Sequence, residues 1–285
     1  MSNIKKKIII GTANFSKKYG VSGNKFNYTD QVKLLKFLKR KNIFYIDTAI
    51  NYNIQNFLKK IKSTKQKFKL ITKIPAINKN ENLINKLLIQ QLEISNQKKF
   101  DTILLHETVK IKNKNLKKSI DFLKCLKKKK ITKKIGLSLY NLDDFNKIKK
   151  YFRPDVLQIP INILDQEFRN KKFISYCKKF KIEVHGRSIF LQGLLVSNQN
   201  SSKFIGKYFN ILEKFCNSKN ILKLDLCLNF VISLGFIDKI VIGLDNLNQL
   251  KEILNYKKTN KNFEIFDKAT ISKNITKPYK WKKKI

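Results

Sequence analysis

The sequence is poor in several residue types, and each shortage narrows what the protein can be. Its 285 residues include only 4 Cys, 4 Pro, 2 His, 1 Met and 1 Trp. Cys125, Cys177, Cys216 and Cys227 form no C-x-x-C pair, so we expect reduced thiols in half-buried helices, not a disulfide framework or a zinc site. Nothing in the sequence resembles a cluster of metal ligands, and we expect no metal.

Long apolar runs are also missing. The basic N-terminus is followed by a three-residue apolar run at 8–10, which is too short for the core of a signal peptide. No run approaches the roughly 20 residues of a membrane helix. We therefore expect a cytoplasmic protein with no membrane contact.

Acidic residues are scarce, with 20 Asp and Glu against 62 Lys and Arg, a formal net charge of +42. Such an excess is typical of proteins that bind nucleic acid or other polyanions. However, arginine occurs only at Arg40, Arg153, Arg169 and Arg187, whereas nucleic-acid sites usually concentrate arginine beside exposed aromatic rings. Lys, Ile, Asn, Phe and Tyr all have A/T-rich codons, so we favour compositional drift over a specific nucleic-acid partner.

Short apolar runs alternate with longer, Lys-rich stretches of helical spacing, and 42% of residues are hydrophobic. The runs predict buried parallel strands at 7–13, 44–49, 68–74, 100–106, 133–140, 155–161, 182–189 and 239–244. Eight strands separated by helices predict a single (β/α)₈ barrel over residues 1–285, with a Lys-rich tail from about 256. A doubly wound open sheet is the alternative, but no G-x-G-x-x-G follows the first strand.

The pattern also predicts where helical stretches lie. They are expected at 29–42, at 115–130, at roughly 168–181, in a long seventh stretch that splits near 216–220, and in an eighth that begins with 247–254. In the first, Thr29 is the expected N-cap, and Val32, Leu35 and Leu38 are expected to share the buried face.

Four polar residues lie at or just beyond the ends of three successive strands: Asp47, Tyr52, Lys73 and His106. In a parallel barrel this end carries the chemistry. Tyr52 would be the proton donor, with Lys73 beside it to lower the phenol pKa into a useful range. Asp47 would hold Lys73, and the imidazole of His106 would orient a substrate carbonyl. Together they predict a proton-transfer site.

These residues give the chain a resemblance to the aldo-keto reductases, from about residue 7 to 255. D-T-A-x-x-Y at 47–52, the lysine of LITKIP and the histidine of ILLHE resemble that family's catalytic tetrad in order and spacing. The resemblance implies NAD(P)H-dependent reduction of a small aldehyde or ketone.

The resemblance also implies cofactor contacts. IIGTANF, GLSLYN, LQIPIN, GRSIFLQGLL and VIGLDNLNQLKE resemble the family's cofactor-binding stretches. The residues carried over, with Asp47, are Gly11, Thr12, Ser138, Gln158, Arg187, Ser188, Gly243, Asn246 and Gln249.

Three positions depart from the family pattern. Leu139 replaces an asparagine that contacts the carboxamide, and Arg187 replaces a tyrosine that stacks on the nicotinamide. Asp245 stands where NADP-binding members often have a basic residue, and an acidic group there suits the free 2′-hydroxyl of NAD. The expected cofactor is therefore NADP or NAD, with a weaker NADP preference than the family default.

Two further functions stay open. The same barrel would serve as a cofactor-binding regulatory module without turnover, because a fold does not fix a function. A nicotinamide-dependent lyase or epimerase acting on a cell-surface sugar precursor is the other. His185, in the seventh strand, is expected to be a core histidine.

Overall fold

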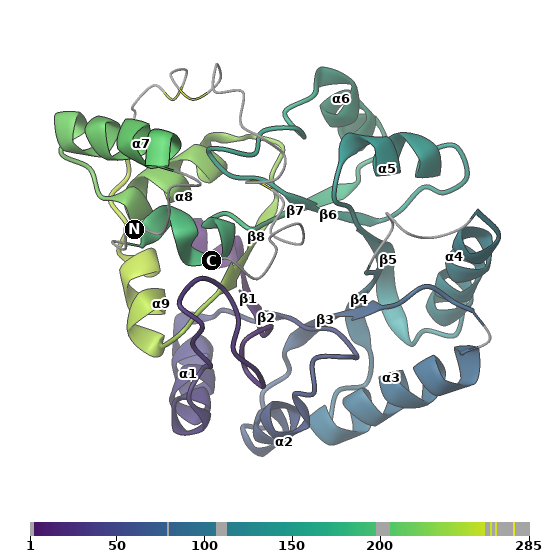
Figure 1. The fold of residues 1–285 in the computed structure, drawn as a ribbon. Helices are drawn as coiled ribbons and strands as arrows, with labels where there is room; N and C mark the ends of the chain where they lie inside the picture. Colours follow the sequence, from purple (N-terminus) through teal and green to yellow (C-terminus); the bar gives the residue numbers. More distant parts are fainter. Residues whose placement is uncertain are drawn as a thin grey trace.

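The computed structural model describes residues 3–78, 80–106, 113–197 and 206–259, together with Phe263, Phe266 and Thr276. Eight parallel strands pair in chain order, and the last pairs with the first, so the sheet closes into a barrel (Figure 1). The strands are β1 (Ile8–Gly11), β2 (Tyr45–Asp47), β3 (Lys69–Ile74), β4 (Phe100–Leu105), β5 (Thr132–Ser138), β6 (Val156–Pro160), β7 (Glu183–Arg187) and β8 (Lys239–Gly243). The predicted (β/α)₈ barrel is confirmed.

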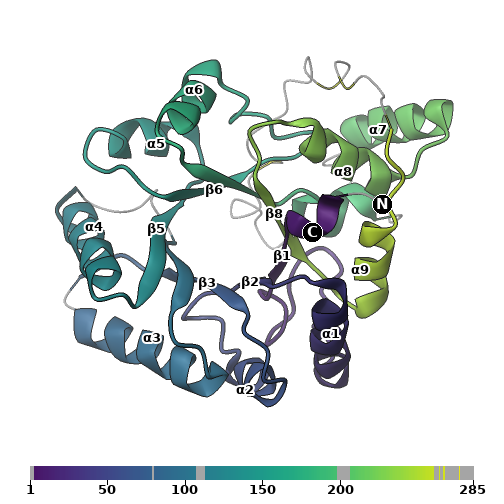
Figure 2. The ribbon, with the colours of Figure 1, turned by 180° about the vertical axis from the view of Figure 1, so that it is seen from behind.

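Helices surround the barrel, as the view from behind also shows (Figure 2). They are α1 (Tyr28–Lys41), α2 (Gln55–Ser63), α3 (Glu81–Ser95), α4 (Asn113–Lys128), α5 (Leu142–Ile148), α6 (Lys171–Lys179), α7 (Gly206–Lys219), α8 (Lys223–Ser233) and α9 (Leu247–Leu254). Two 3₁₀ segments, η1 (Asn3–Lys6) and η2 (Leu191–Val196), complete the described elements. The predicted split of the seventh helical stretch falls between α7 and α8.

Helix α1 corrects two expectations. Its N-cap is Asn27, whose side chain accepts from the backbone N–H of Thr29, so Thr29 lies within the first turn. Val32 is 37% exposed, whereas Leu35 and Leu38 are buried. The buried stripe combines spacings of three and four residues, which follows the helical period more closely than the i+3 series from Val32.

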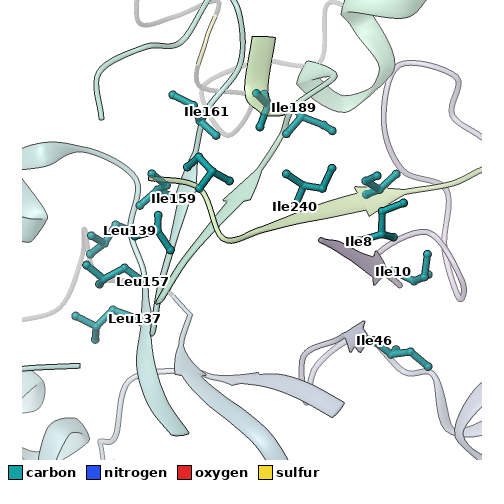
Figure 3. Packing of buried hydrophobic residues seen from close by; sticks show 14 of the residues in the cluster. Ile8, Ile10, Ile46, Leu137, Leu139, Leu157, Ile159, Ile161, Ile189 and Ile240 are labelled. Atoms are coloured by element: carbon teal, nitrogen blue, oxygen red, sulfur yellow. The ribbon is translucent and has the colours of Figure 1, made fainter. Parts of the chain in front are cut away.

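The core has two parts because side chains alternate across each strand. One face of the strands packs outward against the helices, and Figure 3 shows this layer with Ile8, Ile10 and Ile240 in it. The other face forms a small apolar cluster of Ile9, Ile71, Leu104 and Val156. Because this second cluster draws on β1, β3, β4 and β6, it fills the inside of the barrel, so the barrel is packed.

Tight packing of the wall requires one glycine. A Cβ added to Gly136 in β5 would lie 2.0 Å from the carbonyl oxygen of Val156 in the neighbouring strand β6. A side chain there would push the two strands apart.

The cysteines and the tail complete the comparison with the sequence. All four thiols are free; Cys177, Cys216 and Cys227 are buried, but Cys125 is exposed, against expectation. Most of the predicted tail beyond residue 259 lies outside the described residues. Within the described ranges, no helix combines the length and the apolar character needed to cross a bilayer.

Candidate active site

The four residues of the predicted proton-transfer site come together at the carboxyl-terminal end of the barrel. Asp47 is the last residue of β2, Lys73 lies in β3, and His106 directly follows β4. Tyr52 lies in the connection from β2 to α2. All four line one cleft with a volume of about 1220 Å³. Parallel strands bring their ends to one rim, which is why residues 26 or more positions apart in the sequence meet.

Asp47 and Lys73 form a buried ion pair. The ammonium of Lys73 donates to Oδ1 of Asp47, and also to the backbone oxygen of Thr48 at 3.2 Å. Gln158, from the far side of the barrel, donates through Nε2 to the other carboxylate oxygen at 2.8 Å. Asp47 and Lys73 are each 3% exposed. The carboxylate is thus fixed from two strands, and it fixes the lysine in turn.

Tyr52 lies beside both the lysine and the histidine. The Lys73 ammonium is 5.8 Å from the centre of the Tyr52 ring. The rings of Tyr52 and His106 meet edge to face, with centroids 6.1 Å apart. The backbone of Tyr52 is held by Ser16, whose hydroxyl donates to its carbonyl oxygen. A carbonyl group placed between the two rings would meet an O–H and an N–H.

Burial raises the pKa of Tyr52 above its ordinary value, and the negative charge of Asp47 raises it further, while Arg187 opposes the change. The sequence argument predicted the reverse, because it counted the effect of the Lys73 ammonium on the phenol but neither burial nor the charge of Asp47. Burial also lowers the pKa of Lys73, against the pull of Asp47. The phenol is therefore held in its protonated form, which is the form that can donate a proton.

His106 is held neutral. Burial lowers the pKa of its imidazole to about 3, and the positive charges of Lys73 and Arg187 act in the same direction. A neutral imidazole keeps one N–H donor and one acceptor nitrogen. At neutral pH, His106 can therefore donate a hydrogen bond to a substrate oxygen without acting as an acid.

Most residues that the resemblance assigned to the cofactor line the same cleft. They are Gly11, Thr12, Asp47, Ser138, Gln158, Arg187, Ser188, Gly243 and Gln249. Asn246 is the exception: it lies outside the cleft lining, and its side chain caps α9 by accepting from the backbone N–H of Gln249 at 3.0 Å. Its side chain is thus engaged, and only the helix end it supports faces the cleft, through Asn248 and Gln249.

The far end of the cleft carries Asp245. Its carboxylate accepts from Nδ2 of Asn14 at 3.1 Å, and its backbone N–H donates to Oε1 of Gln249 at 2.7 Å. Oδ1 of Asn14 is buried and has no hydrogen-bond partner within the described structure. Asn14 and Asp245 thus present acceptor oxygens, one of them unpaired, at this end of the cleft.

The sequence argument missed the loops that cover the tetrad. Tyr19, from the loop between β1 and α1, lines the cleft and accepts from Nε2 of Gln192 at 3.0 Å. The backbone N–H of Val21 also donates to the carbonyl oxygen of Gln192, so this loop meets the loop that follows β7. Tyr140, just beyond β5, lines the cleft as well. Loop residues carry no periodic signal, so the sequence gave a hint only where a family motif extends into a loop, as GLSLYN does at Tyr140 and GRSIFLQGLL does at Gln192.

His185 lies away from this site. It is 1% exposed, is absent from the cleft lining, and pairs through Nε2 with Oε1 of Glu183 at 2.9 Å. The expectation of a core histidine is confirmed, although Nδ1 has no partner in the described part of the chain.

Comparison with known proteins bears on the whole barrel. A family model described as "Aldo/keto reductase family" matches residues 7–271. An aldo-keto reductase of Bacillus halodurans in its holo form superposes with a TM-score of 0.75 at 14% identity, covering 95% of each chain. A Klebsiella pneumoniae aldo-keto reductase in complex with NADPH gives 0.69 at 13% identity, covering 92% of this chain and 89% of that one.

A third solved structure, a glycerol dehydrogenase from Gluconobacter oxydans, gives a TM-score of 0.69 at 16% identity, covering 91% of this chain and 90% of that chain. At such identities these structures establish the fold. No curated protein matches the sequence.

Proposed function

Because the chain belongs to the aldo/keto reductase family, we propose that it is an oxidoreductase that uses NADPH or NADH to reduce a small aldehyde or ketone to an alcohol. The observation that carries this proposal is the assembled set of Asp47, Lys73, Tyr52 and His106 at the mouth of one cleft, with the first two buried and the other two half-buried. Reduction of a carbonyl needs a proton donor at the oxygen, and this set supplies one.

The residues of the cleft fit a nicotinamide dinucleotide. The cleft runs from the tetrad to the amino-terminal turn of α9, and the unpaired oxygen of Asn14 calls for an N–H or O–H donor such as a dinucleotide carries. Ser138 and Gln158 would hold the carboxamide, with Gly11 and Thr12 beside the nicotinamide. Arg187 and Ser188 would lie between the nicotinamide and the pyrophosphate, and Gly243 and Gln249 would flank the adenosine.

The proposed reaction follows from the protonation states of Tyr52 and His106. When bound, the reduced nicotinamide supplies the hydride that adds to the carbonyl carbon. As negative charge develops on the carbonyl oxygen, the neutral His106 donates a hydrogen bond to it and Tyr52 donates its proton. The alcohol then leaves, and the Lys73 ammonium stabilises the phenolate that remains until solvent returns a proton.

The cofactor preference should lean less toward NADPH than in family members with a basic residue at the position of Asp245. A carboxylate at this end of the cleft repels a 2′-phosphate and can accept a bond from a free 2′-hydroxyl. Asn14 supports this arrangement, because its side-chain amide holds Asp245 in place at 3.1 Å.

The test is to follow oxidation of NADPH and of NADH by purified protein in the presence of a panel of aldehydes and ketones, with carbonyl-free reactions as blanks. Cofactor binding is titrated separately. Binding without oxidation of either cofactor by any carbonyl compound would point to the regulatory module instead. Cofactor turnover that returns the cofactor to its starting redox state would point to a lyase or epimerase.

Three broader expectations stand beside this proposal. Closure of all eight strands into one sheet supports a single domain over the chain. A cytoplasmic location and the lack of a specific nucleic-acid partner remain predictions from composition. Retention on a nucleic-acid matrix, compared with an equally basic control protein over a range of salt concentrations, tests the second of them.

A further inference from the structure

Arg187 introduces a positive charge into the cleft close to the proton-transfer site. It is the last residue of β7, it lines the cleft together with Tyr52 and His106, and it is half-buried. Its guanidinium carbon lies 4.6 Å from the centre of the Tyr140 ring. Nη2 donates to the backbone oxygen of Leu139 at 2.9 Å, and Nη1 lies 3.3 Å from the Ser188 hydroxyl. The guanidinium is thus held in place mainly by the segment that follows β5.

The charge of Arg187 is not balanced by a carboxylate of the described chain. Asp47, the carboxylate of the tetrad, is already bound by Lys73 and Gln158. With Tyr52 and His106 neutral, this part of the cleft carries one net positive charge. A guanidinium has five N–H donors, of which two have hydrogen-bond partners among the described residues. A half-buried arginine with further donors can bind an oxyanion.

The surroundings add hydroxyl groups to that site. The phenols of Tyr19, Tyr52 and Tyr140 line the cleft with Arg187. The charge of Arg187 acts on both Tyr19 and Tyr52, lowering the pKa of each against the effect of burial. Because Arg187, Tyr52 and His106 line one cleft, a single small molecule in it can meet both the guanidinium and the two neutral donors.

We propose that the substrate is a carbonyl compound that also carries an anionic group, a carboxylate or a phosphate, and that Arg187 binds this group and so selects the substrate. The inference rests on the proposed function, since it names the substrate class of the same site. A bidentate arginine–oxyanion pair would fix the orientation of the substrate and balance the charge of the cleft.

A role toward the cofactor alone is the competing explanation, because Arg187 occupies the position where the family has a stacking tyrosine. The two roles differ in one measurable respect. Stacking on the nicotinamide would affect charged and neutral substrates alike, whereas anion binding would affect charged substrates more than neutral ones.

The experiment compares matched pairs of aldehydes. For the carboxylate, the pair is 4-formylbenzoate and its neutral methyl ester; for the phosphate, it is glyceraldehyde 3-phosphate and glyceraldehyde. The values of kcat/KM are measured for wild type, Arg187→Gln and Arg187→Tyr, with cofactor Kd determined for each protein. Arg153→Gln is the control, because it removes the same charge at the other end of the barrel. Arg153 lies just before β6, and its side chain packs over the ring of Phe180.

We expect wild type to prefer the anionic member of at least one pair, and Arg187→Gln to lose about 10- to 100-fold in kcat/KM for that member, the scale of a charge-assisted hydrogen bond. Any loss that arises through the cofactor site should affect both members equally, so at saturating cofactor the ratio of kcat/KM for the anionic to the neutral member should itself fall by about 10- to 100-fold. Arg187→Tyr, which restores the family's residue, should lose the same preference, so it answers the question if the glutamine variant does not fold. The pair that responds identifies carboxylate or phosphate.

Three results would overturn the inference: no preference for either anion in wild type, an equal loss for charged and neutral members, or an unchanged preference after both substitutions. If no aldehyde is reduced at all, the proposed function fails but Arg187 is still tested. Calorimetric titration of wild type and Arg187→Gln with benzoate and with benzamide then decides. Binding of benzoate alone, lost in the variant, supports the anion site, and equal binding of both probes overturns it.

Discussion

The two ends of the barrel each hold a carboxylate bound by a lysine, but they differ in what surrounds the pair. At the carboxyl-terminal end, Asp47 and Lys73 line the large cleft. At the amino-terminal end, Lys134 donates to Glu183, and neither residue belongs to that cleft. Oε1 of Glu183 also lies 3.4 Å from Nζ of Lys239 and 2.9 Å from Nε2 of His185.

The pKa values of Lys73 and Lys134 shift in opposite directions. Burial lowers the pKa of Lys73 and its carboxylate does not compensate. Burial also lowers the pKa of Lys134, but there the hydrogen bond and the charge of Glu183 outweigh it, and the net change is upward. The side chain of Lys134 is 35% exposed and that of Lys73 is 4% exposed, so water solvates the ammonium of Lys134 much better than that of Lys73.

The comparison teaches that an ion pair at a strand end is not by itself a sign of catalysis. The pair at the cleft touches a phenol and an imidazole and is reachable by a ligand. The pair at the other end also lies beside Lys239, so the carboxylate of Glu183 joins β7 to β5 and β8. We therefore expect that replacing the lysine lowers activity at the carboxyl-terminal end of the barrel and lowers stability at the amino-terminal end.

The largest contrast should come from removing one hydroxyl at each end. Tyr52→Phe should lower kcat for carbonyl reduction by roughly 10²- to 10⁴-fold, the scale of a lost general acid, while cofactor Kd stays nearly unchanged. Tyr45→Phe is the control, because its hydroxyl accepts from Lys69 at the opposite end, and its kcat should stay within about twofold of wild type. A fully active Tyr52→Phe would remove Tyr52 as the proton donor.

Replacing the two lysines should separate activity from stability. Lys73→Met removes the cation that stabilises the Tyr52 phenolate, so we expect kcat to fall by at least about 10²-fold or the pH–rate profile to move to higher pH. Lys134→Met should keep kcat within about threefold and lower Tm. Steady-state rates over a range of pH, with Tm for each protein, measure both effects. A normal profile in Lys73→Met would show that Lys73 does not act on Tyr52.

A smaller effect is expected at the far end of the cleft. Asp245→Arg should move the ratio of Kd values for NADH and NADPH toward NADPH by about fivefold or more, since a like-charge contact costs roughly 1 kcal/mol at an effective dielectric near 20. Asp121→Arg makes the same charge change on the exposed side of α4 and should leave the ratio unaltered. Titrations at about 0.15 M salt limit the influence of distant lysines. No shift in Asp245→Arg would mean that Asp245 does not face the 2′ position.

The smallest effect concerns the amino-terminal end and its pH dependence. Hydrogen bonds and charges from His185 and Lys134 outweigh burial and hold the pKa of Glu183 below its ordinary value. A depressed carboxyl pKa stabilises the fold above the unfolded-state value, near 4.3, and this stability is lost as pH falls below it. Glu183→Gln should therefore lower the free energy of unfolding by about 1–3 kcal/mol at neutral pH. Between pH 5 and 3 the free energy of unfolding of this variant should fall less than that of wild type. Equal acid slopes in denaturant unfolding of the two proteins would contradict the argument.

The sequence by itself determined the barrel and the four residues at its mouth. Strand positions followed from apolar runs buried on both faces, and Asp47, Tyr52, Lys73 and His106 followed because each stands at a fixed offset from such a run. Those offsets are local properties of the chain, so the pattern carries them. Even the break between α7 and α8 was marked locally.

Only the tertiary structure decided the electrostatics and the shape of the cleft. The pKa of Tyr52 is raised, not lowered, because burial and Asp47 act on it together, and burial exists only once the loops of Tyr19 and Gln192 close over the strand ends. Asn246 caps a helix and does not line the cleft, while Asn14 meets Asp245 from 231 positions away in the sequence. Such contacts depend on how distant segments pack, and no spacing within the chain encodes them.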